Sequence, residues 1–145
     1  MSFTLNQFKL SNVAGETMNP NTSVISAKIS KDMASYMVAG DGVNLVAAEV
    51  GDLPVVTKMS TGDVAFGVVL FNQQKAKRVA LDVVEIGHKG AIVTMVAATA
   101  ISRGDKVAYS SSTGYVSTTS GTKIGQALDI ASATGDIIRV FIDPA

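Results

Sequence analysis

The sequence predicts a mainly β protein: a small antiparallel β-barrel or sandwich with an extended N-terminal arm and at most one short helix. The first observation is that short runs rich in Val, Ile and Thr recur roughly every 8–12 residues between turn residues. The second is that the 13 glycines of this 145-residue chain are spread along it, as turns and bulges require. The third is that no long amphipathic helix follows any of these runs, which argues against a doubly wound parallel sheet.

The first thirty residues differ from the rest, so we expect an N-terminal arm or irregular edge strand over 1–30 and a β-rich domain over 31–145. The first part mixes Asn, Ser and Thr with isolated apolar residues, and Asn19-Pro20-Asn21 signals a turn. Such a segment buries little by itself and gains order along a partner, for example at a sheet edge. The alternative is that it supplies the first strand of the barrel itself.

One short helix is expected over Ser30–Met37, because Ser30 is a suitable N-cap. Four apolar residues share one helical face there: Ile29, Met33, Tyr36 and Met37. From Val43 onward the apolar period changes to two, which predicts strands. The predicted strands are 43–48, 55–59, 64–70, 78–86, 91–98, 106–109, 115–118, 123–130 and 137–142. Ser60–Asp63 predicts a hairpin turn, and the last strand, apolar on both faces, is expected to be central.

Two stretches of the chain echo one another. The first contains Gly40-Asp41-Gly42-Val43 and Phe66-Gly67-Val68-Val69-Leu70, and the second contains Gly104-Asp105-Lys106-Val107 and Ile124-Gly125-Gln126-Ala127-Leu128. Each also has Ser-Thr-Gly in between, at 60–62 and at 112–114. The spacings inside the copies differ, so this is not a solenoid period. Either β-hairpins look alike because they use few turn residues, or two similar β units pack in one small domain.

Composition and charge remove several classes of function. Twelve Lys and Arg balance twelve Asp and Glu, so the net charge of zero gives no electrostatic footprint for nucleic acid or an anionic membrane. The chain has no Cys and one His, which leaves no thiol nucleophile, no disulfide framework and no histidine-rich metal site. The longest apolar run, Ala91–Ile101, is far shorter than a membrane span. The first residues show no secretory signal pattern.

No catalytic or metal-binding constellation stands out, so we expect no enzymatic activity and no cofactor. His88 lies in the turn-like sequence Gly87-His88-Lys89-Gly90, which is typical of an exposed polar residue. Most carboxylates adjoin Gly or lie at strand ends, where Asp forms turns, and no pair is placed for acid–base work. Asp41, Asp63 and Asp105 each adjoin Gly and could converge on a cation, although turn chemistry accounts for all three.

Four stretches of the C-terminal half carry a resemblance to a known family: 101–107, 112–116, 124–131 and 135–142. With Gly62–Val69 they resemble the small cement or decoration proteins of tailed-phage capsids, over roughly residues 40–145. The resemblance implies a β-rich domain on the outside of an icosahedral head that clamps neighbouring major capsid subunits. It also implies self-association, with a trimer favoured over a dimer, and a protein made in the bacterial cytoplasm and carried on the virion.

Two sets of residues are our candidates for contact with the capsid. The apolar anchors of the arm are Phe3, Leu5, Phe8 and Leu10, and the polar rim is Asn72, Gln73, Gln74 and Lys75. Two other classes of function remain open. A head-fibre or receptor-binding β domain would share this composition. A small β-barrel enzyme that uses only carboxylates would instead need a deep pocket lined by two or more Asp residues.

Overall fold

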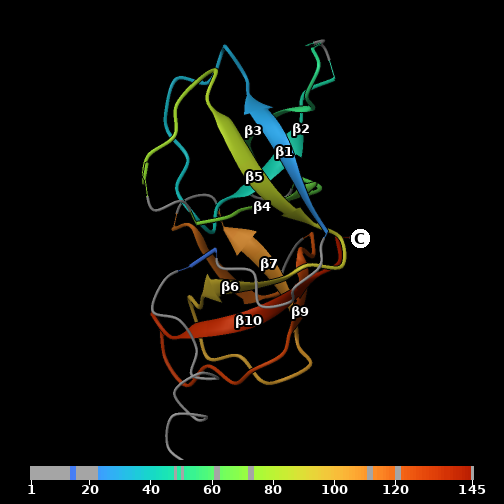
Figure 1. Cartoon of the computed structure of the whole chain (residues 1–145). Helices are drawn as coiled ribbons and strands as arrows, with labels where there is room; N and C mark the ends of the chain where they lie inside the picture. The colour runs from blue at the N-terminus through green and yellow to red at the C-terminus, as the bar shows by residue number, and fades with distance from the viewer. Residues whose placement is uncertain are drawn as a thin grey trace, which may run out of the picture.

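The computed structural model describes residues 14–15, 23–47, 49, 51–60, 63–71, 74–110, 113–119 and 122–144. Regular structure in these segments is all β, in two five-stranded units that lie one above the other (Figure 1). The first unit contains β1 (Val24–Ile29), β2 (Gly42–Leu45), β3 (Val55–Lys58), β4 (Gly67–Val69) and β5 (Val83–His88). The second contains β6 (Ile92–Val96), β7 (Lys106–Ser110), β8 (Tyr115–Thr118), β9 (Gly125–Ala127) and β10 (Ile137–Ile142). The predicted mainly β fold with a small barrel is confirmed.

The first unit is a closed barrel with the strand order β1-β3-β2-β4-β5. It closes because β1 pairs with β3 in parallel on one side and with β5 in antiparallel fashion on the other. β1 is the end of the segment for which we expected an arm or an irregular edge strand. Since it is paired on both sides, residues 24–29 belong to the barrel, as the alternative prediction had it. Residues 1–13 and 16–22 of the expected arm lie outside the described residues.

The second unit is a five-stranded sheet with the order β6-β10-β9-β7-β8. Its two end strands meet through a parallel bridge between Ala97 and Val116, where the Ala98 N–H donates to the Val116 carbonyl at 2.7 Å. β10 lies between β6 and β9 and buries every second side chain. The predicted central position of the last strand is therefore confirmed.

The two units have the same topology in the same register. β1 to β5 correspond in order to β6 to β10, and each pairing in the first unit has its counterpart in the second. Matching pairs include Ala27–Val84 with Met95–Ile138, Val43–Gly67 with Val107–Gly125, and Val69–Ile86 with Ala127–Val140. The echo in the sequence is thus an internal structural repeat, and the interpretation as two similar β units is confirmed.

One part of the echo was misleading. β3 and β4 are not neighbours, because Val43 of β2 pairs with Lys58 of β3 on one side and with Gly67 of β4 on the other. The hairpin predicted at Ser60–Asp63 is therefore wrong. The two ends of this stretch still lie close together, because the Ser60 N–H donates to the Asp63 carboxylate at 2.9 Å. The Ser-Thr-Gly sequence of the second unit does connect the paired strands β7 and β8.

The helix expected over Ser30–Met37 is absent: the stretch has a turn at Lys31 and Asp32, is otherwise irregular, and ends in a β-bridge at Met37. Met37 explains why. Its N–H donates to the Arg78 carbonyl at 2.8 Å, the Arg78 N–H donates back at 2.9 Å, and its side chain is fully buried. The backbone and side chain of Met37 are both used by the barrel, and Ser30 donates its hydroxyl to Glu49. Tertiary pairing thus overrides the helical pattern.

The repeat extends to the core. The first barrel is filled by Ala27, Ile29, Met37, Val43, Val56, Val69, Val84 and Ile86. Their repeat partners, all buried in the core of the second unit, are Met95, Ala97, Ile101, Val107, Val116, Ala127, Ile138 and Val140. Ala27 and Ile29 correspond to Met95 and Ala97, so the small and the large side chain exchange places along the strand. Such compensated changes keep the total volume and are the best tolerated in cores.

Candidate functional site

The seam between the two units is an apolar contact. Met59, Val68 and Leu70 point out of the first barrel and join the core of the second unit. In the second unit, the repeat partners of Met59 and Val68 are Thr119 and Gln126, which are both exposed. The end of the first unit is therefore built to be covered, whereas the equivalent end of the second unit is built to face water. A polar outer end is typical of a terminal repeat.

A buried polar contact joins the units inside this seam. The Tyr109 hydroxyl of β7 donates to Asp41 Oδ1 at 2.8 Å, and both residues are 2% exposed. Asp41 also accepts the Val38 N–H at 2.8 Å and has Lys58 Nζ at 3.7 Å. Burial raises the pKa of the Tyr109 hydroxyl far above its ordinary value, and the negative charge of Asp41 raises it further. The phenol therefore stays protonated and can keep donating.

The short segment Ala14–Gly15 also bridges the two units. The Gly15 N–H donates to the Thr94 carbonyl of β6 at 2.7 Å, and its carbonyl accepts the Phe71 N–H of the first unit at 2.9 Å. Gly15 has a φ of +83°, and a Cβ there would lie 2.8 Å from the carbonyl oxygen of Val69. The backbone of Gly15 thus links the two units by hydrogen bonds, at a position where only glycine fits.

Most described aspartates serve turns. In five turns an Asp carboxylate accepts the backbone N–H three residues earlier, at Asp41, Asp63, Asp82, Asp105 and Asp136. The turn role predicted for Asp41, Asp63 and Asp105 is confirmed. Within the described segments no three acidic, His or Cys side chains are grouped for a metal ion, and no helix is long and apolar enough to cross a membrane.

The candidate contact residues are only partly covered by the structure. Phe3, Leu5, Phe8, Leu10, Asn72 and Gln73 lie outside the described residues. Gln74 is exposed, and Lys75 pairs with Asp82 at 2.8 Å. The hydrogen bond from Lys75 is the main cause that holds the pKa of Asp82 below its ordinary value. His88 ends β5, half-buried, with its ring stacked on Phe66 at 6.0 Å.

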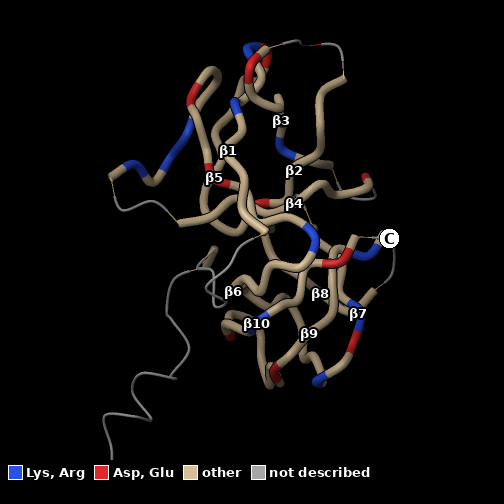
Figure 2. The backbone as a smooth tube through the Cα atoms, turned by 45° about the vertical axis from the view of Figure 1, so that its right-hand side comes forward, with Lys and Arg blue, Asp and Glu red and all other residues tan. Residues whose placement is uncertain are grey.

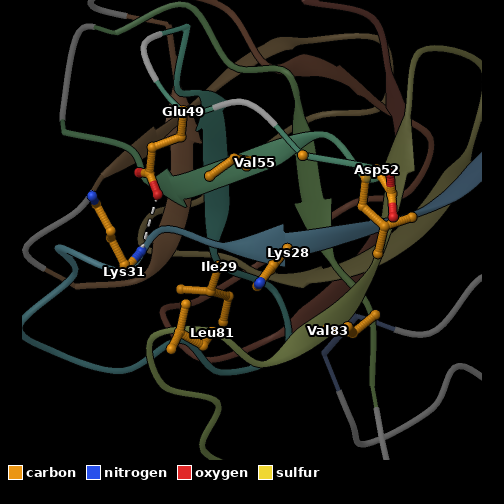
Figure 3. Close-up of a pocket in the computed structure, with 10 residues that line it drawn as sticks. Lys28, Ile29, Lys31, Glu49, Asp52, Val55, Leu81 and Val83 are labelled. Atoms are coloured by element: carbon orange, nitrogen blue, oxygen red, sulfur yellow. Dashed lines mark hydrogen bonds between the residues drawn. The ribbon is translucent and has the colours of Figure 1, made fainter.

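A groove lies on the outer face of the first barrel (Figure 3). It runs over β1, β3 and the start of β5 and has a volume of about 640 Å³. Its lining is apolar at Ile29, Leu53, Val55, Leu81 and Val83, and charged at Lys28, Lys31, Glu49 and Asp52. Sequence reasoning missed this groove, because its lining comes from three stretches that are far apart in the chain.

Charges around the groove and elsewhere are mixed in sign. Figure 2 shows Lys and Arg interspersed with Asp and Glu over both units. The strongest described ion pair joins Arg139 and Asp129 through two contacts, at 2.9 and 2.7 Å. The hydrogen bond from Arg139 lowers the pKa of Asp129, although Arg139 is 42% exposed.

Comparison with known proteins finds a likeness in structure alone. No family model matches the sequence, and no curated protein matches it. Among solved structures, the chain is similar to the N base of the head fibre protein gp8.5 of bacteriophage phi29. The TM-score is 0.58 at 15% identity, over 83% of this chain and 92% of that one. At this identity the likeness shows that the two proteins share the fold.

Proposed function

We propose that this chain is a structural protein of a phage head, which docks on the outer surface of the capsid and bridges and stabilises major capsid subunits. The shared fold carries the proposal: most of this chain matches most of the solved N base of a head fibre protein. The resemblance of the C-terminal motifs to capsid cement proteins points the same way.

The chemistry of the described surface supports a binding role. Most of the described aspartates close turns, His88 is stacked on Phe66, and the groove has a mixed apolar and charged lining. The two units are joined by an apolar seam and a buried hydrogen bond, and their ends differ. A body of this kind can span two neighbouring subunits of a shell, and many weak contacts on one shell add up.

The base of a head fibre is the second candidate function. The solved structure that matches is described as such a base, and this chain covers 92% of it. In this case the protein would occupy isolated positions and carry a projecting structure rather than cover the shell. In both cases we propose that the protein associates with itself, with a trimer favoured over a dimer. We also propose that the arm residues Phe3, Leu5, Phe8 and Leu10 contact the shell.

Shells assembled with and without the protein test the proposal. We expect the protein to sediment with shells of the phage that encodes it and to raise their rupture temperature. Electron microscopy of the same particles separates the candidates, because a bridging protein covers regular sites and a fibre base marks isolated ones. Failure to sediment with these shells would overturn both. Binding without any change in rupture temperature would exclude the bridging function and leave the fibre base as the function supported.

A further inference from the structure

The internal repeat shows what normally covers the face that carries the groove. Val96, Thr113 and Tyr115 of the second unit are the repeat partners of Lys28, Leu53 and Val55, three residues of the groove. In the second unit this face lies against the loop 35–41 of the first unit, and the two together line a smaller hollow. The same face of the first unit has no such cover from any described segment.

The uncovered face is apolar where exposure would favour polar residues. Leu81, two residues before β5, is 58% exposed, and Val83, the first residue of β5, is 53% exposed. Two further residues of the floor, Leu53 and Val55, come from β3 and the residues before it. Exposed apolar side chains that line one groove and are rimmed by charges are typical of an interaction site.

Leu81 carries independent evidence that this face is used. Its φ is +72°, and it is the one non-glycine residue in the left-handed region among those described. Its repeat partner is Gly135, with a φ of +97°. The two occupy the same place: the Leu81 N–H donates to the Ile29 carbonyl, and the Gly135 N–H donates to the Ala97 carbonyl. A strained, exposed leucine where glycine suffices indicates that the side chain serves something other than folding.

The chain also carries a second copy of the loop that covers such a face. The loop 99–105 of the second unit is the repeat partner of 35–41. Its turn is the same, with Gly104 at φ +91° against Gly40 at +92°, and with Asp105 accepting the Ser102 N–H as Asp41 accepts that of Val38. Ala100, Ser102 and Arg103 of this loop are exposed.

We propose that the groove of the first unit binds the loop 99–105 of a second copy of this chain. This deepens the self-association that forms part of the proposed function. Both sides of the contact carry charges of both signs, Arg103 and Asp105 in the loop and Lys28, Lys31, Glu49 and Asp52 in the groove, so opposite charges are available for pairing. The end of the second unit is polar, so two copies cannot form an apolar seam like the one between the two units of one chain. The contact between copies is therefore confined to the loop and the groove, and it is weaker than the seam.

The contact is heterologous, since each copy offers one groove and one loop. We expect the full-length protein to associate in sedimentation velocity at micromolar concentration. Leu81→Gly and Val83→Glu should each weaken this about tenfold or more, as loss of a central apolar contact does. Leu81→Gly should melt no lower than the wild type, which rules out misfolding as the cause. Val64→Glu is the matched control, because Val64 is 61% exposed and lies outside the groove.

Mixing two impaired variants is the decisive measurement. Val83→Glu leaves the loop intact, and Arg103→Glu leaves the groove intact, so each alone should be monomeric at a concentration at which the wild type associates. An equimolar mixture should form a dimer and nothing larger, because only one contact per pair remains. Groove variants that associate like the wild type, a wild type that stays monomeric, or a mixture that stays monomeric would overturn the proposal.

Shell binding distinguishes this inference from the proposed function. Wild-type protein that associates through the groove and yet fails to bind shells would leave the inference standing and refute the function. Groove variants that lose shell binding but keep self-association would refute the inference and assign the groove to a shell protein. Monomeric variants that still bind shells would support both.

Discussion

Removing the hydroxyl of Tyr109 tests directly whether the two units act as one body. In Tyr109→Phe, the carboxylate of Asp41 loses a donor at 2.8 Å inside a seam where both side chains are 2% exposed. Loss of a hydrogen bond to a buried charged group costs about 1.5–3 kcal/mol. Asp41 keeps the Val38 N–H and the more distant Lys58, so we expect a loss near the lower end, about 1.5–2 kcal/mol of unfolding free energy.

The assay is urea unfolding of the full chain, followed by far-ultraviolet circular dichroism and evaluated at constant m-value. The matched control is Tyr115→Phe on the neighbouring strand β8, where Tyr115 is half-buried and outside the core. That control should change stability by less than about 0.5 kcal/mol. A double-mutant cycle with Asp41→Asn should show coupling between the two positions. If Tyr109→Phe is as stable as Tyr115→Phe, the seam does not depend on this contact.

Three further perturbations follow from the structure. The free energy of unfolding should fall above about pH 10, by up to about 1.4 kcal/mol per pH unit. The reason is that the pKa of Tyr109 is raised in the folded protein, so its hydroxyl loses its proton at a lower pH in the unfolded chain. A pH series in which Tyr109→Phe shows the same fall would refute this. Gly67→Ala should cost about 1–3 kcal/mol in urea unfolding, because its Cβ would lie 2.5 Å from the Gly87 oxygen; unchanged stability would contradict the close approach. The lowered pKa of Asp129 stabilises the fold above about pH 4, and this contribution is lost on acidification. Asp129→Asn should therefore flatten that part of the acid unfolding curve, and a curve that matches the wild type would show that Arg139 adds nothing.

The strands and the repeat could be predicted because they depend on local patterns. Alternating apolar residues locate β2, β5, β7 and β10, and Asp beside Gly locates the turns. The central place of β10 follows from its two apolar faces. These features are determined by side chains close together in the chain, where periodicity is informative.

The errors arose where distant contacts decide. Met37 lies in a helical pattern, but its backbone pairs with Arg78 across the barrel. Ser60–Asp63 has the residues of a hairpin turn, but β2 separates the strands on its two sides. The groove was missed for the same reason: an exposed Leu81 is meaningful only once its repeat partner Gly135 is known. No local pattern shows such a correspondence.

The unequal ends of the two units matter while the chain is being synthesised. The first barrel is complete once β5 has left the ribosome, because all its strand partners precede that point. Its apolar end, formed by Met59, Val68 and Leu70, is covered only when the second unit folds. At about 5–20 residues per second this end is exposed for several seconds. Substitutions that delay folding of the second unit should therefore lower the soluble yield in cells more than they lower the stability of the finished protein.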